Sequence, residues 1–328
     1  MLDDFIDGPI AWQASDLDER VWRVALTDEA LSELDAIARA FADYDGPFDA
    51  LQPDAMDWPA TTEVMIDVRT SLDQGIGFAI VDRMPVERWT EKGSRAVAWL
   101  LNNFLAPAIM QKWKGARVYD VRDTGAKLAY GIRRSVTNLE QEYHTDGSFL
   151  AKTPSLMGLA CLRQAAEGGL SRIASLAAAH NVLRDSSPEL LARLYRPFYW
   201  DRQAEHAAGE VPSSAHPVFW YDGVRLGGRY YDDYIRNGYK LMHQPIDDLG
   251  MAALAAMRQI VEAPGSGFEF RLKPGEVFFL NNHLVAHGRS AFRDAQQGDV
   301  AGGGRLLLRF WLRRGGGITL EASEPVPA

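Results

Sequence analysis

The spacing of apolar residues predicts helices in the first third of the chain. After Thr27, a residue type that caps helix N-termini, apolar side chains recur at helical spacing over residues 31–41. A second helix is expected at about 59–72 and a third at about 94–104. We therefore expect residues 1–115 to form a mostly helical part that packs on the rest of the protein.

From residue 116 onward the pattern changes to short apolar runs separated by turn residues. Asp222-Gly223 is typical of a hairpin, and Lys273-Pro274-Gly275 of a tight turn. Such a pattern favours a mainly β fold with helical additions (α+β), built on a double-stranded β-helix, the jelly roll of cupin-like proteins. We expect one domain over 1–328, whose core at 116–315 carries helical insertions. The expected strands are 78–81, 117–121, 142–146, 156–162, 171–175, 217–221, 268–272, 276–280 and 305–312, and the expected inserted helices are 188–194 and 247–261.

Two other segments are interpreted structurally. Residues 199–216 are polar and contain Gly209 and Pro212, so we expect a surface loop or a mobile lid. The aromatic-rich stretch that includes Tyr231 and Tyr234 is expected to serve core and strand packing and not to form a substrate cage.

Composition and charge exclude several classes of partner. The chain has 328 residues, of which 47% are hydrophobic and 24% charged, with a net charge of −9. Lys and Arg do not form runs interleaved with aromatic residues, so we expect no nucleic-acid partner. Apolar stretches stay below the ~18 residues of a membrane span, and the acidic start does not resemble a signal peptide. We expect a cytoplasmic protein that acts on a small molecule.

His144-Thr145-Asp146 is the leading candidate for a metal site. A His and an Asp two residues apart on a strand project to the same face and can bind one ion together. A second His would complete the two-His-one-carboxylate triad of non-haem Fe(II) oxygenases. His283 and His287 both lie on a late strand, and we choose His287. The alternative is a solvated His–Asp pair and a His that caps a loop.

Two arginines on a late apolar strand suggest an anionic ligand. Arg305 and Arg309 point to the same side of the predicted strand, where unpaired cations are costly. A carboxylate cosubstrate would suit them, because arginine binds carboxylates through two hydrogen bonds; structural Asp or Glu partners are the alternative. Glu142 would project to the same face as His144. It could orient a metal ligand, contact a cationic substrate group or be a solvated charge.

These motifs occur in the order of a known family. From about Gly75 to Leu312 the chain resembles the Fe(II)/2-oxoglutarate-dependent dioxygenases of the taurine dioxygenase and clavaminate synthase-like superfamily. The gap of 18 residues between His287 and Arg305 is longer than in many relatives, and a Gly-rich segment absorbs it. The matching motifs are His144-Thr145-Asp146, Gly168-Gly169-Leu170-Ser171, His287-Gly288-Arg289 and the pair Arg305 and Arg309.

The resemblance implies the roles of these residues. His144, Asp146 and His287 would bind Fe(II). Arg305 and Ser171 would hold the C5 carboxylate of 2-oxoglutarate, and Arg309 would meet an anionic group of the primary substrate.

The resemblance also implies the reaction. The expected activity uses O2 and 2-oxoglutarate to oxidise an unactivated C–H bond of a small polar, anionic or amino-acid-like substrate, with release of succinate and CO2. Related halogenases carry a small residue in place of Asp146, so its carboxylate favours hydroxylation, or another oxidation such as desaturation. Two alternatives remain: a cupin-type metal enzyme that does not use 2-oxoglutarate, and a jelly-roll binding protein without enzymatic activity.

Overall fold

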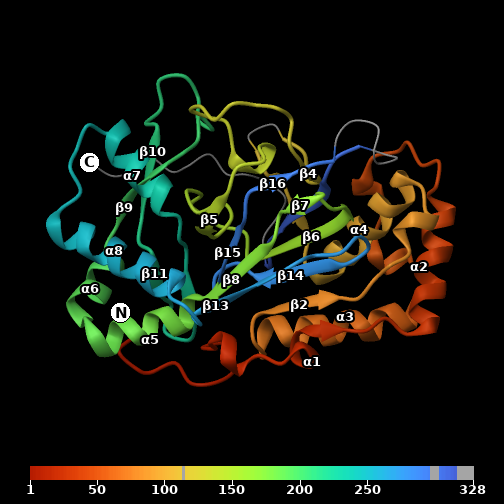
Figure 1. Ribbon diagram of the computed structural model, residues 1–328, viewed down its shortest axis with the longest axis horizontal. Helices are drawn as coiled ribbons and strands as arrows, with labels where there is room; N and C mark the ends of the chain where they lie inside the picture. The colour runs from red at the N-terminus through yellow and green to blue at the C-terminus, as the bar shows by residue number, and fades with distance from the viewer. Residues whose placement is uncertain (113–114, 296–302, 316–328) are drawn as a thin grey trace.

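The fold consists of two facing β-sheets with helices on their outer sides (Figure 1). The computed structural model describes residues 1–112, 115–295 and 303–315. None of the described helices combines the length and the apolar character needed to cross a membrane. The helices within these ranges are α1 (Glu19–Trp22), α2 (Asp28–Ala40), α3 (Pro59–Asp73), α4 (Glu91–Leu105), α5 (Leu176–Ser186), α6 (Pro188–Leu194), α7 (Asp232–Leu241) and α8 (Asp248–Glu262).

The larger sheet, called the major sheet here, has the strand order β1-β2-β14-β6-β17-β3, and β4 also pairs with β17. Its strands are β1 (Arg23–Val24), β2 (Phe78–Val81), β3 (Ala108–Ile109), β4 (Tyr119–Val121), β6 (Leu156–Arg163), β14 (Val277–Asn281) and β17 (Leu306–Leu312).

The smaller sheet, called the minor sheet here, has the order β13-β8-β15-β5 and supplies most of the site residues. It consists of β5 (Gln141–His144), β8 (Ser171–Ser175), β13 (Gly267–Phe270) and β15 (Val285–Arg289). Short antiparallel pairs complete the fold: β7 (Glu167–Gly168) with β16 (Phe292–Arg293), β9 (Phe198–Asp201) with β10 (Ser213–His216), and β11 (Phe219–Tyr221) with β12 (Leu226–Gly228).

The alternation of side chains along β2 explains how the layers are held together. Phe78 and Ile80 belong to the apolar core between the two sheets, whereas Ala79 and Val81 pack with the residues of α2, α3 and α4. Because both faces of this strand are covered, all four of its residues are buried. Helices α2, α3 and α4 thus pack on the outer face of the major sheet.

Most predicted elements agree with the structure, and three segments differ. The expected helices near 27–41, 59–72 and 94–104 are confirmed as α2, α3 and α4. The prediction that residues 199–216 form a loop is wrong at both ends, because β9 and β10 pair with each other there. Helices α5 and α7 were not predicted.

Candidate functional site

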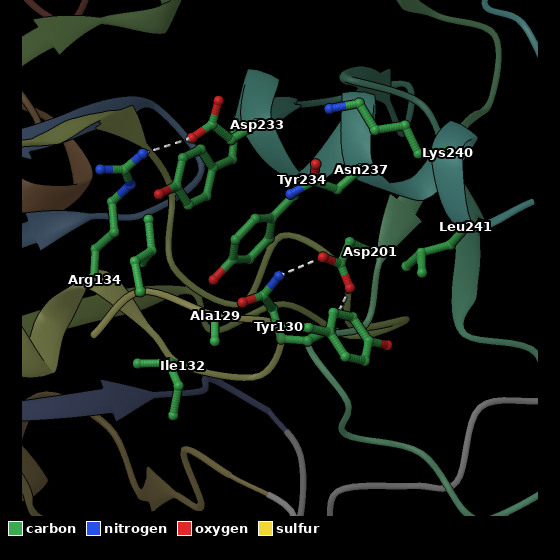
Figure 2. A pocket seen from close by; sticks show the side chains of 13 residues that line it. Ala129, Tyr130, Ile132, Arg134, Asp201, Asp233, Tyr234, Asn237, Lys240 and Leu241 are labelled. Atoms are coloured by element: carbon green, nitrogen blue, oxygen red, sulfur yellow. Dashed lines mark hydrogen bonds and ion pairs between the residues drawn. The ribbon is translucent and has the colours of Figure 1, made fainter. Parts of the chain in front are cut away.

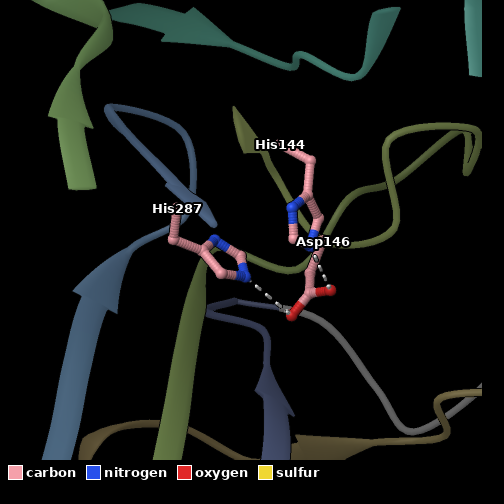
Figure 3. Close-up of side chains that lie close together, drawn as sticks. All are labelled: His144, Asp146 and His287. Atoms are coloured by element: carbon pink, nitrogen blue, oxygen red, sulfur yellow. Dashed lines mark ion pairs between the residues drawn. The ribbon is translucent and has the colours of Figure 1, made fainter. Parts of the chain in front are cut away.

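His144, Asp146 and His287 lie together between the two sheets (Figure 3). One donor atom from each residue can be chosen so that all three lie within 4.8 Å of one another. The His144 Nε2 atom is 3.8 Å from Asp146 Oδ1, and the His287 Nε2 atom is 3.8 Å from Asp146 Oδ2. All three residues belong to the buried or nearly buried interior. The sequence prediction therefore selected three residues that the fold brings together.

Strand pairing places the two imidazoles next to each other. His144 is the last residue of β5 and His287 is the middle residue of β15, and the two residues are direct partners in the antiparallel ladder. Their ring centroids are 4.2 Å apart. The expectation that His144 and Asp146 share one strand is corrected, because β5 ends at His144 and Asp146 lies beyond it.

Backbone contacts hold Asp146 in place after the strand ends. The Asn282 side chain accepts a hydrogen bond from the Asp146 N–H at 2.8 Å and donates to the Asp146 and Pro154 carbonyls. The Thr145 N–H donates to the Tyr230 carbonyl at 2.7 Å, and the Thr145 hydroxyl accepts from the Tyr230 N–H. Asn282 is 1% exposed, so no water competes for these bonds.

Burial keeps the two imidazoles neutral, which is the form that binds metals. Burial lowers the pKa of His287 to about 3 and also lowers the pKa of His144. The His144 Nδ1 lies 2.9 Å from the Glu142 carbonyl oxygen, which fixes the tautomer with a lone pair on Nε2. The Gln141 amide nitrogen is 2.9 Å from this Nε2 and donates a hydrogen bond to its lone pair.

Arg309, on β17 of the opposite sheet, forms an ion pair with Asp146. Its Nη1 is 3.0 Å from Asp146 Oδ1, and its Nε donates to Gln111 Oε1 at 2.8 Å. Burial raises the pKa of Asp146, but Arg309, His287, His144 and Trp311 together outweigh it, and the pKa is lowered overall. Gln111, fully buried, was missed by sequence reasoning because it is 198 residues away from Arg309. The Arg309 Nη2 keeps no partner among the described residues.

A small cavity of about 40 Å³ adjoins the two imidazoles, and Arg305 and Ser171 line it. Arg289 lines it too, although the sequence analysis gave this last residue of the His287-Gly288-Arg289 motif no role of its own. The strand register explains this, because Arg289 on β15 is the direct partner of Ser171 on β8. Arg289 Nε and Nη1 and Arg305 Nη1 are buried and without a hydrogen-bond partner in the described part of the chain.

The two guanidinium groups in this cavity share one aromatic support. The Arg289 and Arg305 guanidinium carbons lie 4.7 and 5.1 Å from the centroid of the Phe292 ring. Burial lowers the pKa of Arg289 to about 9 and of Arg305 to about 10, and Arg305 further lowers that of Arg289. Neither forms an ion pair with a carboxylate in the ranges that the structure describes. Both remain charged at neutral pH, so the cavity suits an anion.

Two other candidates lie elsewhere. Glu142 forms an ion pair with Arg258 at 2.8 Å and is not among the residues that line the cavities beside His144. The Glu142 carboxylate therefore meets Arg258, and the contact of Glu142 with His144 comes from its main-chain carbonyl. His283, the alternative third ligand, points to the Thr153 hydroxyl at 2.8 Å and does not join the cluster.

A second, larger cavity of about 440 Å³ is lined by residues that include Asp201, Tyr234 and Lys240 (Figure 2). Tyr231 lines this cavity, and its ring centroid is 5.0 Å from that of His144. The Tyr231 ring also stacks on Tyr234, with centroids 4.2 Å apart. The expectation of packing alone is corrected for these two tyrosines, which are both part of a core cluster and the wall of a cavity.

Comparison with known proteins relates this geometry to a family. Residues 29–311 match the family described as Taurine catabolism dioxygenase TauD, TfdA family. Among curated proteins, FR-33289 synthase of Streptomyces rubellomurinus is 29% identical over 244 residues, which cover 74% of this chain and 70% of that protein. The taurine hydroxylase-like protein SAT17 of Stachybotrys chartarum is 29% identical over 175 residues, or 51% of this chain and 41% of that protein.

Solved structures share the fold. Asparagine oxygenase in complex with Fe(II), 3-hydroxyasparagine and succinate has a TM-score of 0.65 at 19% identity, covering 89% of this chain and 93% of that chain. The non-haem iron oxygenase OrfP in complex with Fe and alpha-ketoglutaric acid has a TM-score of 0.66 at 17% identity, with the same coverage. These likenesses confirm the predicted class of fold.

Proposed function

The chain belongs to the taurine catabolism dioxygenase (TauD, TfdA) family, and from this membership we propose its reaction and the roles of its residues. It is a 2-oxoglutarate-dependent non-haem iron oxygenase that hydroxylates an unactivated C–H bond of a small polar substrate. One observation carries the assignment: the two imidazoles beside Asp146 line the same buried cavity as two guanidinium groups without a carboxylate partner.

The His144, Asp146 and His287 side chains fit an Fe(II) ion. Two neutral imidazoles and one carboxylate are the donor set of non-haem Fe(II) oxygenases. Donors bound at about 2.1 Å lie at most about 4.2 Å apart, and the two N–O separations of 3.8 Å are within that limit. Asp146 Oδ2 is buried without a hydrogen-bond partner, as expected of an atom reserved for a metal. The Gln141 amide would leave His144 Nε2 when a metal binds.

Arg305, Ser171 and Arg289 are proposed to hold the distal carboxylate of 2-oxoglutarate. The three residues line the small cavity beside the imidazoles, so one dicarboxylate could reach both the metal ligands and the guanidinium groups. Charge-assisted hydrogen bonds from arginine to a carboxylate are about twice as strong as neutral ones. The sequence suggested only Arg305 and Ser171 for this role, and we add Arg289 because it lines the same cavity.

Iron bound here would supply the oxidative chemistry, in which one oxygen atom of O2 enters succinate and the other enters the product, with loss of CO2. The protein orients the reactants. The Glu142 carbonyl holds the His144 ring through Nδ1, and Asn282 and Arg309 hold Asp146. The apolar side chains of Met157, Leu159 and Phe278 line the cosubstrate cavity and keep water from it.

The primary substrate is proposed to bind in the larger cavity, which Tyr231 separates from His144. The solved relatives named above contain hydroxylated asparagine or 2-oxoglutarate, which supports an amino-acid-like substrate. The Nη2 group of Arg309 has no hydrogen-bond partner among the described residues and could meet an anionic group of that substrate, whereas Nη1 contacts Asp146 and Nε contacts Gln111. This distribution of contacts favours a role for Arg309 in holding both the iron ligand and the substrate.

Succinate formation from 2-oxoglutarate with Fe(II) and O2 tests the proposal. We expect His144→Ala and Asp146→Ala to lose at least ~100-fold in succinate formation, because each removes one of three ligands. The control is Asp185→Asn, which alters a largely exposed carboxylate on α5. The anaerobic Fe(II) protein should also develop a weak visible charge-transfer band with 2-oxoglutarate. Undiminished turnover in both alanine variants, or metal-dependent turnover without 2-oxoglutarate, would contradict the assignment.

A further inference from the structure

Asp201 is a buried carboxylate that lines the larger cavity and forms no ion pair with the residues that the structure describes. It is the last residue of β9 and is 1% exposed. Its two oxygens accept hydrogen bonds from the Gln203 N–H and from the Gln203 side-chain amide. A carboxylate has about four acceptor positions, so two positions remain. Burial raises the pKa of Asp201, which reports the cost of keeping this charge inside.

The basic side chains around the cavity do not neutralise Asp201. Arg134 is engaged by Asp233 at 3.2 Å on the far side of the cavity, as Figure 2 shows. Lys240 lines the cavity but forms no ion pair with any residue that the structure describes. His206 acts on Asp201 through its charge, but its ring contacts Tyr130 and the Ala207 carbonyl. A buried carboxylate without a cation is costly, so this one is suited to a cation from outside the chain.

The segment after β9 is built to present these groups. Gln203 and Ala204 both have left-handed backbone angles, with φ of 54° and 58°. Two consecutive non-glycine residues in this region cost free energy, which the surrounding contacts must supply. The conformation brings the Gln203 N–H and the Gln203 amide onto the same carboxylate.

Tyr234 connects this carboxylate with the metal side of the cavity. Figure 2 shows its ring between the Arg134–Asp233 pair and Asp201. Burial raises the pKa of Tyr234, and the charges of Asp201 and Arg309 act on its hydroxyl in opposite directions. One face of the Tyr234 ring stacks on Tyr231. Faces of aromatic rings attract cations, so the other face could contact a cationic group. The larger cavity therefore has a carboxylate with aromatic walls, and its wall residue Tyr231 lies against His144, whereas Arg309 lines the small cavity.

We propose that Asp201 binds a cationic group of the primary substrate, an ammonium or a guanidinium, so that the substrate is a zwitterion of the basic amino-acid class. The inference rests on the proposed function, since it concerns the substrate of the same site. The cationic end would lie against Asp201 and the face of Tyr234, and the rest of the substrate would extend along the larger cavity toward Tyr231, whose ring lies against His144. The contact with Asp201 would set the direction in which a substrate lies in this cavity.

Binding to matched pairs of amino acids tests the inference. L-arginine is compared with L-citrulline, in which a neutral ureido group replaces the guanidinium, and L-lysine with L-norleucine. The protein carries Mn(II) and 2-oxoglutarate so that no turnover occurs, and the dissociation constants come from calorimetry. We expect at least one cationic member to bind ten times or more tightly than its neutral partner. Equal affinities within both pairs, or no binding of either cationic amino acid, would overturn the inference.

Two variants assign the preference to Asp201. Asp201→Asn keeps the shape and should abolish the preference for the cationic member. Gln203→Lys keeps the carboxylate but supplies an internal cation, and it should have the same effect. A preference that survives in both variants would refute the role of Asp201. Binding of 2-oxoglutarate alone to the Mn(II) protein, measured first, tests the proposed function separately: absent binding contradicts that function, whereas intact binding without cation preference contradicts only this inference.

Discussion

At the scale of single residues, Arg289 provides a sharp test of how the small cavity binds its ligand. We expect Arg289→Met to raise the KM for 2-oxoglutarate about 30-fold, because losing charge-assisted hydrogen bonds to a carboxylate costs about 2 kcal/mol. The kcat at saturating 2-oxoglutarate should change far less. A matched control is Arg293→Met, since that side chain is 72% exposed and pairs with Glu167.

A purely structural Arg289 would give a different result. The Arg289 Nη2 donates to the carbonyls of Thr137 and Leu139, so the methionine variant could lose stability without affecting the cosubstrate. Thermal unfolding of the variant measures that loss directly. If the melting temperature falls while the KM for 2-oxoglutarate stays constant, the residue serves only the backbone. Partial recovery of the KM in Arg289→Lys would support the role of the charge.

The residues that could be predicted from sequence are those that a short motif fixes. His144 and Asp146 are two residues apart in the sequence, and His287 is followed by a glycine; the structure brings these three residues together, and their role as iron ligands stays a prediction. Gln111 and Asn282 could not be identified, because they act on Arg309 and Asp146 from 198 and 136 residues away. Only the strand register and the chain path show such partners.

At the scale of elements, the corner formed by α5 and α6 should respond to acid. His180 on α5 is fully buried, and its Nε2 lies 2.9 Å from the Tyr195 hydroxyl. Burial lowers the pKa of His180 from 6.5 to about 4. Above pH 6.5 the residue is neutral in both the folded and the unfolded state and contributes no pH dependence. Between pH 6.5 and 4 only the unfolded state binds the proton, so stability falls as the pH falls.

The size of this effect can be measured with one variant. A single histidine reduces the free energy of unfolding by about 1.4 kcal/mol per pH unit in that range, or about 3 kcal/mol in total. We expect His180→Gln to lose less stability than the wild type between pH 7 and pH 4.5 in urea unfolding. The other buried histidines remain in both proteins, so their contributions cancel. An identical pH dependence in the two proteins would contradict the prediction, because it would show that the pKa of His180 is the same in the folded and the unfolded state.

Helices and strands with a clear period were predicted well, whereas elements that depend on tertiary contacts were not. Strand β2 was predicted with the observed bounds, because its four apolar residues stand between turn residues. The strands β9 and β10 were predicted as a loop, since their buried faces include Ser213 and Ser214, which do not alternate with polar residues as in a half-buried strand. Their pairing with each other supplies the regularity that the sequence does not show.

At the scale of the whole molecule, the metal and 2-oxoglutarate should each stabilise the folded protein, one after the other. Binding at 100 times the dissociation constant adds about 2.7 kcal/mol, which raises the melting temperature of a protein of this size by about 5 °C. We expect Mn(II) to give one increase and 2-oxoglutarate a second, because the ligand relieves the repulsion between Arg289 and Arg305. Removal of the metal with a chelator should reverse both.

The variant Arg305→Met separates the two increases. It removes one cation of the cosubstrate cavity but none of the three metal ligands, so the increase with Mn(II) should persist and that with 2-oxoglutarate should disappear. The same melting curves address the single domain over 1–328, which remains a prediction. One cooperative transition would support it, and two separate transitions would argue for independent units.

The ion pair between Arg309 and Asp146 limits how the substrate specificity of this protein can change during evolution. Arg309 is the residue whose replacement would most directly alter the preference for an anionic substrate, yet its guanidinium also holds a metal ligand from the opposite sheet. On the roles proposed above, a change at this position would affect both metal retention and substrate range. New specificities are therefore more accessible through changes around Asp201 and Tyr234, on the wall of the larger cavity, than through Arg309.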